Sequence, residues 1–288
     1  MTRSADRLPS GTRLGLVTLR VADLERSLTF YRGVVGLEAR AGARSDRLAL
    51  GPAGGDTLLE LEERPGTRPV PAGGRIGLYH VALLLPDRAG LIAFARHLGA
   101  IGARAGAADH LVSEAFYLTD PDGLGIEVYA DRPREAWGVR GGELHMDTLP
   151  LDLEGLLAET HGEAWTGMPR ATTVGHLHLH VGDLERARAF YVDAVGFDVT
   201  VASFPGALFL AAGPYHHHLG LNTWSRSAPA GEDDARLLDW EIVVPTRDDV
   251  AAAAHRLTRS APDRGDGSGA LSLVDPWGIP LSLRSAEA

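Results

Sequence analysis

The sequence predicts an α+β fold built from four βαβββ units in two halves. Residues 19–31, LRVADLERSLTFY, return as residues 179–191, LHVGDLERARAFY. A turn also recurs, as Asp-Pro-Asp-Gly at 120–123 and as Asp-Pro-Trp-Gly at 275–278. Internal repeats indicate an architecture before single residues are considered, because each copy is one structural unit.

In the first unit, residues 16–21 form a short β-type run, and Asp23 is a good N-cap for the helix that follows. Apolar side chains then recur at helical spacing up to Gly36, which ends the helix. The short apolar runs 48–50 and 57–61 flank a Gly/Pro-rich stretch, so they predict a hairpin.

In the second unit, residues 78–85 form an apolar strand that ends at Pro86. An amphipathic helix is predicted around residues 91–98, where apolar side chains recur at helical spacing. Two strands, 113–118 and 126–129, flank the first Asp-Pro-x-Gly turn, whose composition suits a tight reversal.

The third unit, residues 174–224, repeats the first. The fourth unit is the faintest copy, with strands at 237–244, 270–274 and 279–283 and a helix around 250–257. A Gly- and Asp-rich stretch at 261–269 is predicted to be a loop.

These signals divide the chain into two domains and a linker. We expect a first domain at 12–132 with units one and two, and a second at 174–286 with units three and four. The linker, 133–173, has mixed composition and a short predicted helix within 151–159.

Length and composition restrict the class of protein. At 288 residues the chain can hold two domains with hydrophobic cores. Its formal net charge of -10 argues against nucleic-acid or anionic-membrane partners, which require a basic surface. No run approaches the ~20 apolar residues that span a bilayer, and the start lacks a signal-peptide core, so we expect a cytoplasmic protein. A homo-oligomer is compatible with the sequence. Cysteine is absent, so any metal must be held by His, Asp or Glu.

The paired V-x-D-L-E-R-x-x-x-F-Y helices resemble those of the vicinal oxygen chelate superfamily, which includes glyoxalases, bleomycin resistance proteins and extradiol dioxygenases. The likeness continues at 79–86, 109–123 and 125–133, and it is closest at 175–179 and 213–222. Together these segments resemble two-domain type I extradiol ring-cleavage enzymes of the catechol 2,3-dioxygenase kind. The resemblance implies half-open barrels and covers nearly the whole chain, thinning in the fourth unit.

In this superfamily the metal ligands lie on the first and last strands of each unit. The matching first-strand positions are Leu16, His80 and His176 in units one to three, and Glu241 is the nearest equivalent in unit four. Glu127 holds the last-strand position of unit two. The resemblance therefore implies a metal site of His80, Glu127 and His176. Two imidazoles and a carboxylate form the facial triad typical of non-haem Fe(II) oxygenases, which leaves adjacent coordination positions open.

Strand periodicity supports this set of ligands. In strand 78–84, alternation places His80 on one face and Tyr79 on the other. In strand 176–180, His176, His178 and His180 share a face. A single strand histidine is usually structural. Matched positions in repeated units, on apolar strands where a charge is costly to bury, favour ligands instead.

The resemblance also implies three catalytic residues. Tyr117 matches a tyrosine that hydrogen-bonds the bound substrate oxygen, His110 matches a histidine that assists it, and His217 matches the acid–base histidine. Imidazole suits proton transfer because its pKa is about 6.5. Strand alternation from Gly220 would instead turn His216 and His218 inward. Either the regular strand begins after His218 or this residue takes the acid–base role, and we favour His217.

Other side chains are expected to form the walls of the same cup. His178, His218 and Tyr129 are predicted to contact substrate rather than metal. The remaining aromatic candidates either line the substrate site or pack the linker onto the core, and they are Trp137, Trp165 and Trp224.

The predicted ligands come from both halves of the chain. His80 and Glu127 belong to unit two and His176 to unit three, while Ser282 stands where unit four would carry a glutamate. If each half of the chain formed its own half-open barrel, neither barrel would hold all three predicted ligands. We therefore predict that unit two pairs with unit three, and unit one with unit four, within one chain or between two subunits.

The resemblance implies an enzyme that uses Fe(II) and O2 to open catechol, or a substituted catechol, to a 2-hydroxymuconate semialdehyde-type product. Mn(II) fits the same ligands. One alternative is a metal-dependent glyoxalase- or epimerase-like lyase or isomerase, although such sites usually need a second carboxylate where Gly220 stands. Another is a metal-free protein that sequesters a small aromatic drug, which would leave the three predicted ligands without a task.

Overall fold

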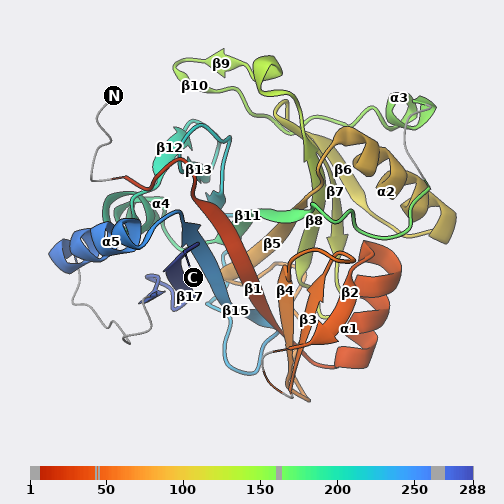
Figure 1. The fold of residues 1–288 in the computed structure, drawn as a ribbon, viewed down its shortest axis with the longest axis horizontal. Helices are drawn as coiled ribbons and strands as arrows, with labels where there is room; N and C mark the ends of the chain where they lie inside the picture. Colours follow the sequence, from red (N-terminus) through yellow and green to blue (C-terminus); the bar gives the residue numbers. More distant parts are fainter. Residues whose placement is uncertain (1–6, 43, 45, 160–163, 261–269, 288) are drawn as a thin grey trace.

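The protein is described by a computed structural model that covers residues 7–42, 44, 46–159, 164–260 and 270–287. The predicted loop at 261–269 lies outside the described residues. Strands dominate the fold and helices flank them, as expected for an α+β protein (Figure 1).

The elements follow the predicted order of units. Unit one comprises β1 (Arg13–Val21), α1 (Leu24–Phe30), the π-helix η1 (Tyr31–Val35), β2 (Glu38–Ala41), β3 (Arg47–Gly51) and β4 (Leu59–Glu63). Unit two comprises β5 (Gly77–Leu84), α2 (Arg88–Ile101), β6 (Gly106–Asp109), β7 (Ser113–Thr119) and β8 (Gly125–Asp131). The linker contains η2 (Arg134–Ala136), β9 (Val139–Arg140), β10 (Glu143–Leu144) and the predicted short helix, α3 (Leu153–Ala158).

The second half repeats this order. Unit three comprises β11 (Thr173–His180), α4 (Leu184–Arg188), the π-helix η3 (Ala189–Val195), β12 (Asp198–Val201), β13 (Ala207–Ala211) and β14 (Leu219–Asn222). Unit four comprises β15 (Arg236–Val244), α5 (Arg247–Ser260), β16 (Leu271–Val274) and β17 (Pro280–Ser285). Within the described part of the chain, unit four thus has the three predicted strands, one fewer than the full βαβββ pattern.

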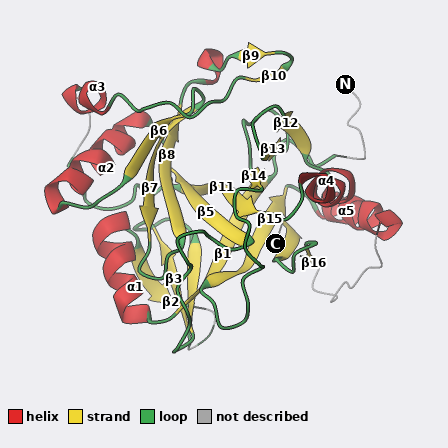
Figure 2. Ribbon diagram, turned by 180° about the vertical axis from the view of Figure 1, so that it is seen from behind, coloured by secondary structure: helices red, strands yellow, loops and turns green. Residues whose placement is uncertain are grey.

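The strands form two large curled sheets (Figure 2). One has the order β12-β13-β14-β11-β5-β8-β7-β6, and the other has the order β16-β17-β15-β1-β4-β3-β2. Antiparallel pairing of β5 with β11 joins units two and three, and pairing of β1 with β15 joins units one and four. The pairing predicted from the ligands therefore forms within one chain. The predicted domain bounds, 12–132 and 174–286, stay a prediction. Each of the two large sheets combines one unit from the first segment with one from the second.

The repeated helix sequence forms the same local structure twice. The side chains of Asp23 and Asp183 cap their helices by accepting the backbone N–H of Arg26 and Arg186. Each helix widens into a π-helical turn and ends at a glycine in the left-handed region, with φ of 86° at Gly36 and 105° at Gly196. Glycine suits that position because it has no Cβ.

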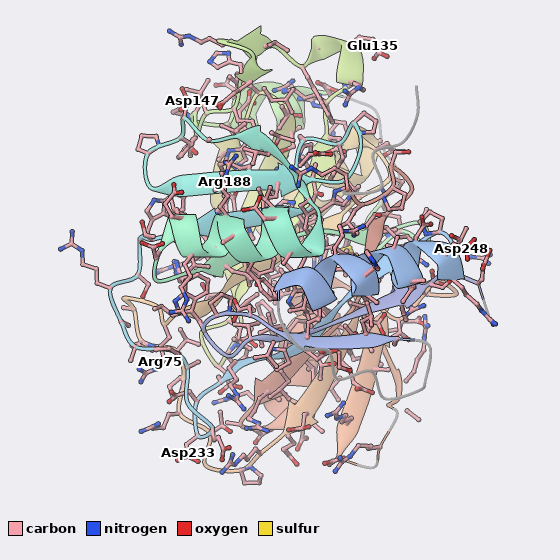
Figure 3. The ribbon with its side chains drawn as sticks, turned by 90° about the vertical axis from the view of Figure 1, so that its left-hand side faces the viewer. Arg75, Glu135, Asp147, Arg188, Asp233 and Asp248 are labelled. Carbon is pink, nitrogen blue, oxygen red and sulfur yellow. The ribbon has the colours of Figure 1, made fainter. Side chains whose placement is uncertain are left out.

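The main apolar core runs between the sheets and the helices. Its largest fully buried side chains include Trp240, Tyr31 and Tyr191. Full burial of such side chains supplies most of the stabilising free energy, at about 25 cal/mol per Å² of apolar surface. Figure 3 shows α4 and α5 one above the other on the outside of this core, with Arg188 on α4 and Asp248 on α5.

Among the described residues, no helix has both the length and the apolar character needed to cross a lipid bilayer.

Candidate metal centre

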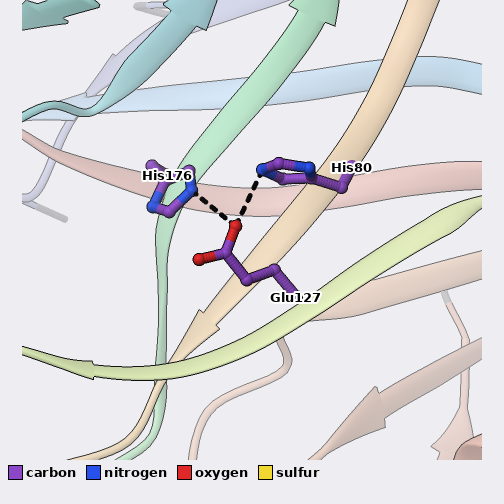
Figure 4. A group of neighbouring side chains, drawn as sticks. All are labelled: His80, Glu127 and His176. Carbon is purple, nitrogen blue, oxygen red and sulfur yellow. Dashed lines mark hydrogen bonds and ion pairs between the residues drawn. The ribbon is translucent and has the colours of Figure 1, made fainter. Parts of the chain in front are cut away.

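His80, Glu127 and His176 meet on one face of the eight-stranded sheet (Figure 4). Ala82 on β5 stands opposite His176 on β11 and opposite Glu127 on β8. His80 lies two positions from Ala82 on the same strand, and therefore on the same face. The register of three adjacent strands brings together side chains that are far apart in the sequence.

The three side chains converge on one point. Glu127 Oε2 lies 2.8 Å from His80 Nε2 and 3.2 Å from His176 Nε2. One ligand atom from each residue lies within 4.8 Å of the other two. All three residues are buried, with exposed fractions of 5% for His80, 1% for Glu127 and 2% for His176. Two imidazole nitrogens and a carboxylate oxygen in this arrangement fit a divalent ion of the non-haem iron type.

The protonation states also fit a metal. Burial alone would raise the pKa of Glu127, but His176 and His80 beside it hold this pKa well below its ordinary value. Burial lowers the pKa of His176 to about 4. At neutral pH the site therefore offers an ionised carboxylate and an uncharged His176 imidazole, which are the forms that bind a metal.

Tyr129 packs beside the site, against His176. Its fully buried ring packs 4.8 Å from the ring of His176, measured between centroids. Its hydroxyl group bonds to that of Tyr215 at 2.7 Å. A Cβ at Gly175 would lie 1.9 Å from the Tyr129 hydroxyl oxygen, so only glycine fits there. Tyr129 is not among the residues that line the cavity described below, so the expected contact with substrate does not agree with its position.

A cavity of about 500 Å³ opens over the three side chains. Its polar side is formed by residues predicted from the sequence, namely His80, His110, Tyr117, Glu127, His176, His178 and His217. Its apolar side is formed by Met146, Phe204, Phe209 and Trp224. The linker contributes Met146 because a β-bridge between Leu149 and Asp109 holds the linker against β6.

Tyr117 and His110 form a hydrogen-bonded pair in the cavity wall. Tyr117 stands opposite Glu127 in the β7–β8 register. His110 Nδ1 lies 2.8 Å from the carbonyl oxygen of Asp147, and its Nε2 lies 2.5 Å from the hydroxyl oxygen of Tyr117. A carbonyl only accepts, so Nδ1 carries the hydrogen and Nε2 of a neutral ring accepts the Tyr117 hydroxyl. Burial and Glu127 raise the Tyr117 pKa well above 10, so this phenol keeps its proton.

The structure separates the two candidate acid–base histidines. Strand β14 begins at Leu219, so strict alternation does not extend to His217 or His218. The His217 ring lines the cavity, 4.2 Å from the His176 ring between centroids. Burial lowers the pKa of His217 well below 6.5, which keeps the ring neutral.

His218 points away from the cavity, contrary to the expectation that it contacts substrate. It is not among the residues that line the cavity, and its Nδ1 accepts the backbone N–H of Ala212 at 3.2 Å. Its ring packs on Tyr215, 4.9 Å away between centroids. The irregular backbone before β14 is the reason, because it turns successive side chains in directions that strand alternation does not describe.

His178 lines the cavity beside His80, its partner across β5 and β11. Gly220 makes room for it, since a Cβ at that position would lie 2.9 Å from the His178 ring. Burial and His80 lower the pKa of His178 well below 6.5. Its Nε2 has no hydrogen-bond partner among the described residues, so this nitrogen can bind a ligand.

Tyr79 is a cavity residue that strand alternation missed. The β5–β11 register shifts between His178 and Leu179, which leaves Tyr79 as an extra residue on β5. Such a bulge redirects a side chain. The Tyr79 ring consequently lies 4.9 Å from the His80 ring and 5.8 Å from that of Trp224, between centroids. No local signal in the sequence marks this bulge.

The other two tryptophans are packing residues. Trp137 packs on His216, with ring centroids 5.1 Å apart, and donates its indole N–H to the carbonyl of Arg132. Trp165 packs on the buried Phe94 of α2, with ring centroids 5.1 Å apart. Of the three candidates, only Trp224 lines the cavity described above.

The seven-stranded sheet carries different side chains at the corresponding positions. Asp239 stands opposite Thr18 in the same way that His80 stands opposite His178. Asp239 is therefore the unit-four counterpart of His80, and the assignment of Glu241 to that position was wrong. Glu241 corresponds to Ala82, since each stands opposite the last strand of its unit, at Ser282 and Glu127.

In this second half-barrel Glu241 is held by structural contacts. Its carboxylate accepts the backbone N–H of Leu16 at 3.1 Å and pairs with Arg284 at 2.9 Å. Leu16 and Ser282 stand where the other sheet has His176 and Glu127. The corresponding positions therefore lack the imidazoles of the candidate metal centre.

Comparisons with known proteins agree with this geometry. Residues 13–128 and 173–283 match the family described as the Glyoxalase/Bleomycin resistance protein/Dioxygenase superfamily. The chain belongs to this superfamily. The expected superfamily and fold class, with two glyoxalase-like halves, are thus confirmed.

Individual known proteins resemble the chain to different extents. It is 44% identical over 272 residues to the Catechol-2,3-dioxygenase of Bacillus subtilis (strain 168), a match that covers 92% of this chain and 94% of that protein. The solved cppA protein from Streptococcus pneumoniae TIGR4 is 16% identical with a TM-score of 0.56, covering 95% of this chain and 97% of that one. Glyoxalase I from Zea mays is 17% identical with a TM-score of 0.53, covering 95% and 92%. The last two likenesses concern the fold.

Proposed function

We propose that the protein is an extradiol ring-cleavage dioxygenase that acts on catechol or a substituted catechol with Fe(II) and O2. The buried cluster of His80, Glu127 and His176 beneath a cavity is the observation that carries the proposal. The relative named Catechol-2,3-dioxygenase, 44% identical over most of both chains, supports the same reaction class. Bound Fe(II) would supply coordination of both diol oxygens and activation of O2.

The residues around the three proposed ligands have matching tasks. The Tyr117 hydroxyl, donated to His110, keeps a lone pair that accepts a hydrogen bond from a substrate hydroxyl. His217 offers a neutral imidazole on the cavity wall, which takes a proton from the diol and returns it at a later step. His178 offers its unpaired Nε2 to substrate.

The apolar wall suits an aromatic ring. An aromatic ring in the cavity can pack on the rings of Phe204, Phe209 and Trp224. The flexible thioether of Met146 lies on the same apolar wall. The volume of about 500 Å³ is within the range of about 300–1,000 Å³ that holds drug-sized ligands. We therefore propose that ring substituents are accommodated beside the diol.

Reconstitution tests the proposal. Metal-free protein is loaded with Fe(II) without oxygen, excess iron is removed, and catechol and then air are added. We expect O2 uptake equal to catechol loss, and a yellow product with the mass of catechol plus one O2. Parallel loading with Mn(II) decides between the two ions. Absence of O2 uptake with a panel of catechols, or isomerisation of a glyoxalase-type substrate without O2, would overturn the proposal.

A further inference from the structure

We propose that Asp131 and His216 are positioning residues for His217. Together they set which ring nitrogen of His217 carries the hydrogen, and they direct the other nitrogen, Nε2, to the cavity. Only the catalytic consequence of this arrangement rests on the proposed function. The arrangement itself is a property of the metal-free chain.

A chain of short contacts links the three residues. His216 Nε2 lies 2.8 Å from Asp131 Oδ1. His216 Nδ1 lies 2.7 Å from His217 Nδ1. The side chain of His216 is fully buried, whereas that of Asp131 keeps 25% of its surface exposed. The contacts therefore run from the protein surface to the ring that lines the cavity.

Asp131, the acceptor at one end of these contacts, determines which nitrogen carries each hydrogen in the two rings. An ionised carboxylate only accepts, so Nε2 of His216 carries the hydrogen. In a neutral imidazole the other nitrogen then accepts, so the hydrogen between the two rings belongs to Nδ1 of His217. A neutral His217 is left with a lone pair on Nε2. That is the form a proton-accepting group needs.

The surroundings hold His216 in this orientation. The hydroxyl group of Thr200 donates to its backbone carbonyl at 2.7 Å. Its ring packs against those of Tyr215, 4.1 Å away, and Trp137, 5.1 Å away, measured between centroids. The Tyr215 hydroxyl also donates to Asp131 Oδ1 at 3.4 Å. A side chain fixed from several directions is suited to orient a neighbour.

The same network reaches the proposed metal ligands. Tyr215 bonds to the Tyr129 hydroxyl, and the Tyr129 ring packs on His176. Strand β8 carries both Glu127 and Asp131, so one strand positions a proposed ligand and the anchor of His217. The orientation of His217 is thereby tied to the same rigid sheet as the three proposed ligands.

Nitrogen NMR of the metal-free protein tests the arrangement directly. Protein labelled with ¹⁵N-histidine at pH 8 gives long-range ¹H–¹⁵N correlations that show which nitrogen of each ring is protonated, and loss of signals in His217→Asn assigns this ring. We expect hydrogen on Nδ1 and a bare Nε2 at His217. Hydrogen on Nε2 of His217, or on both nitrogens of His216, would overturn the proposal.

Variants test the cause. His216→Phe keeps a ring packed against Tyr215 and Trp137 but removes the acceptor, so we expect His217 to lose its single tautomer. Asp131→Asn replaces an obligate acceptor with an amide and keeps the shape, so it should shift the tautomers if His216→Phe does not fold. His97→Gln, remote from this network, is the matched control and should leave the His217 signals unchanged. An unchanged His217 tautomer in folded Asp131→Asn would contradict the proposal.

Kinetics of the iron-loaded enzyme give a second readout. We expect Asp131→Asn to lower kcat about 10- to 100-fold, the range for residues that orient a functional group, with KM and iron content retained. Asp131→Glu should recover part of the loss because it restores a carboxylate. A fall in iron content that matches the fall in kcat would contradict a positioning role. If the wild-type protein lacks dioxygenase activity, the proposed function fails while the NMR result still decides the arrangement.

Discussion

The hydroxyl group of Tyr31 donates a hydrogen bond to the buried carboxylate of Asp120 at 3.2 Å, and Tyr191 makes the same bond to Asp275 at 3.0 Å. Each tyrosine belongs to the repeated helix, and each aspartate opens an Asp-Pro-x-Gly turn in the following unit. Units one and two lie in different sheets, as do units three and four. The repeated helix and the repeated turn therefore contact each other. This contact occurs twice, and each time it links the two large sheets.

Replacing Tyr31 with phenylalanine should destabilise the protein by about 1–3 kcal/mol, because a buried acceptor loses its partner. Burial already raises the pKa of Asp120 to about 6, which shows how poorly this carboxylate is solvated. Urea unfolding measures the change, and Tyr191→Phe should give a loss of similar size. If both variants unfold at the wild-type midpoint, the contact does not stabilise the fold.

Alanine at His80, Glu127 or His176 should each abolish tight metal binding. Each substitution removes one of three protein donors, so we expect a loss of affinity larger than the ~10–100-fold typical of residues that only support a ligand. Iron content after dialysis and calorimetric titration with Fe(II) measure it. His97→Gln, on α2 beside Gly33 and away from the three proposed ligands, is a control that should retain the metal. Retained iron in all three alanine variants would contradict the proposed site.

The cavity position of His217 predicts that His217→Asn lowers kcat by about 10²–10⁴-fold, the usual contribution of a general acid–base group. Iron content should stay at the wild-type value, because His217 is not one of the three proposed ligands. Steady-state O2 uptake measures the effect, and His218→Asn gives the comparison. Collapse of turnover in His218→Asn alone would assign the role to the other histidine.

His218 should make the stability of the metal-free protein depend on pH. Burial, with a smaller effect from His216, lowers its pKa to about 3, whereas an unfolded histidine has a pKa of about 6.5. Below that value the unfolded chain takes up a proton that the folded chain does not. Stability is therefore fully present above pH 6.5 and falls as the pH drops towards 3, by about 1.4 kcal/mol per unit for this residue.

Urea unfolding at several pH values checks this slope. His218→Gln removes the titrating ring and offers an amide oxygen to the Ala212 N–H. Between pH 6.5 and 4, we expect the unfolding free energy of the variant to depend less steeply on pH. The difference in slope should correspond to the uptake of about one proton. Identical slopes in the two proteins would show that His218 does not contribute.

Local patterns were enough to predict much of the molecule. The helix caps at Asp23 and Asp183, the glycine ends and the turns follow from neighbours along the chain, whose conformational preferences act within a few residues. The superfamily, and with it the fold class, followed from the repeat and its motifs. The three residues expected to bind metal do lie together, although their binding of an ion stays a prediction.

Long-range register could be read only from the folded chain. Alternation placed Tyr79 on the wrong face and His218 in the cup, because a bulge and an irregular loop change side-chain direction without a local signal. The correspondence of Asp239 with His80 likewise depends on strand pairing. The contact between Asp131 and His216 joins residues from different halves of the chain. Such contacts form where two sheets curl and pair, and no short stretch of sequence contains both partners.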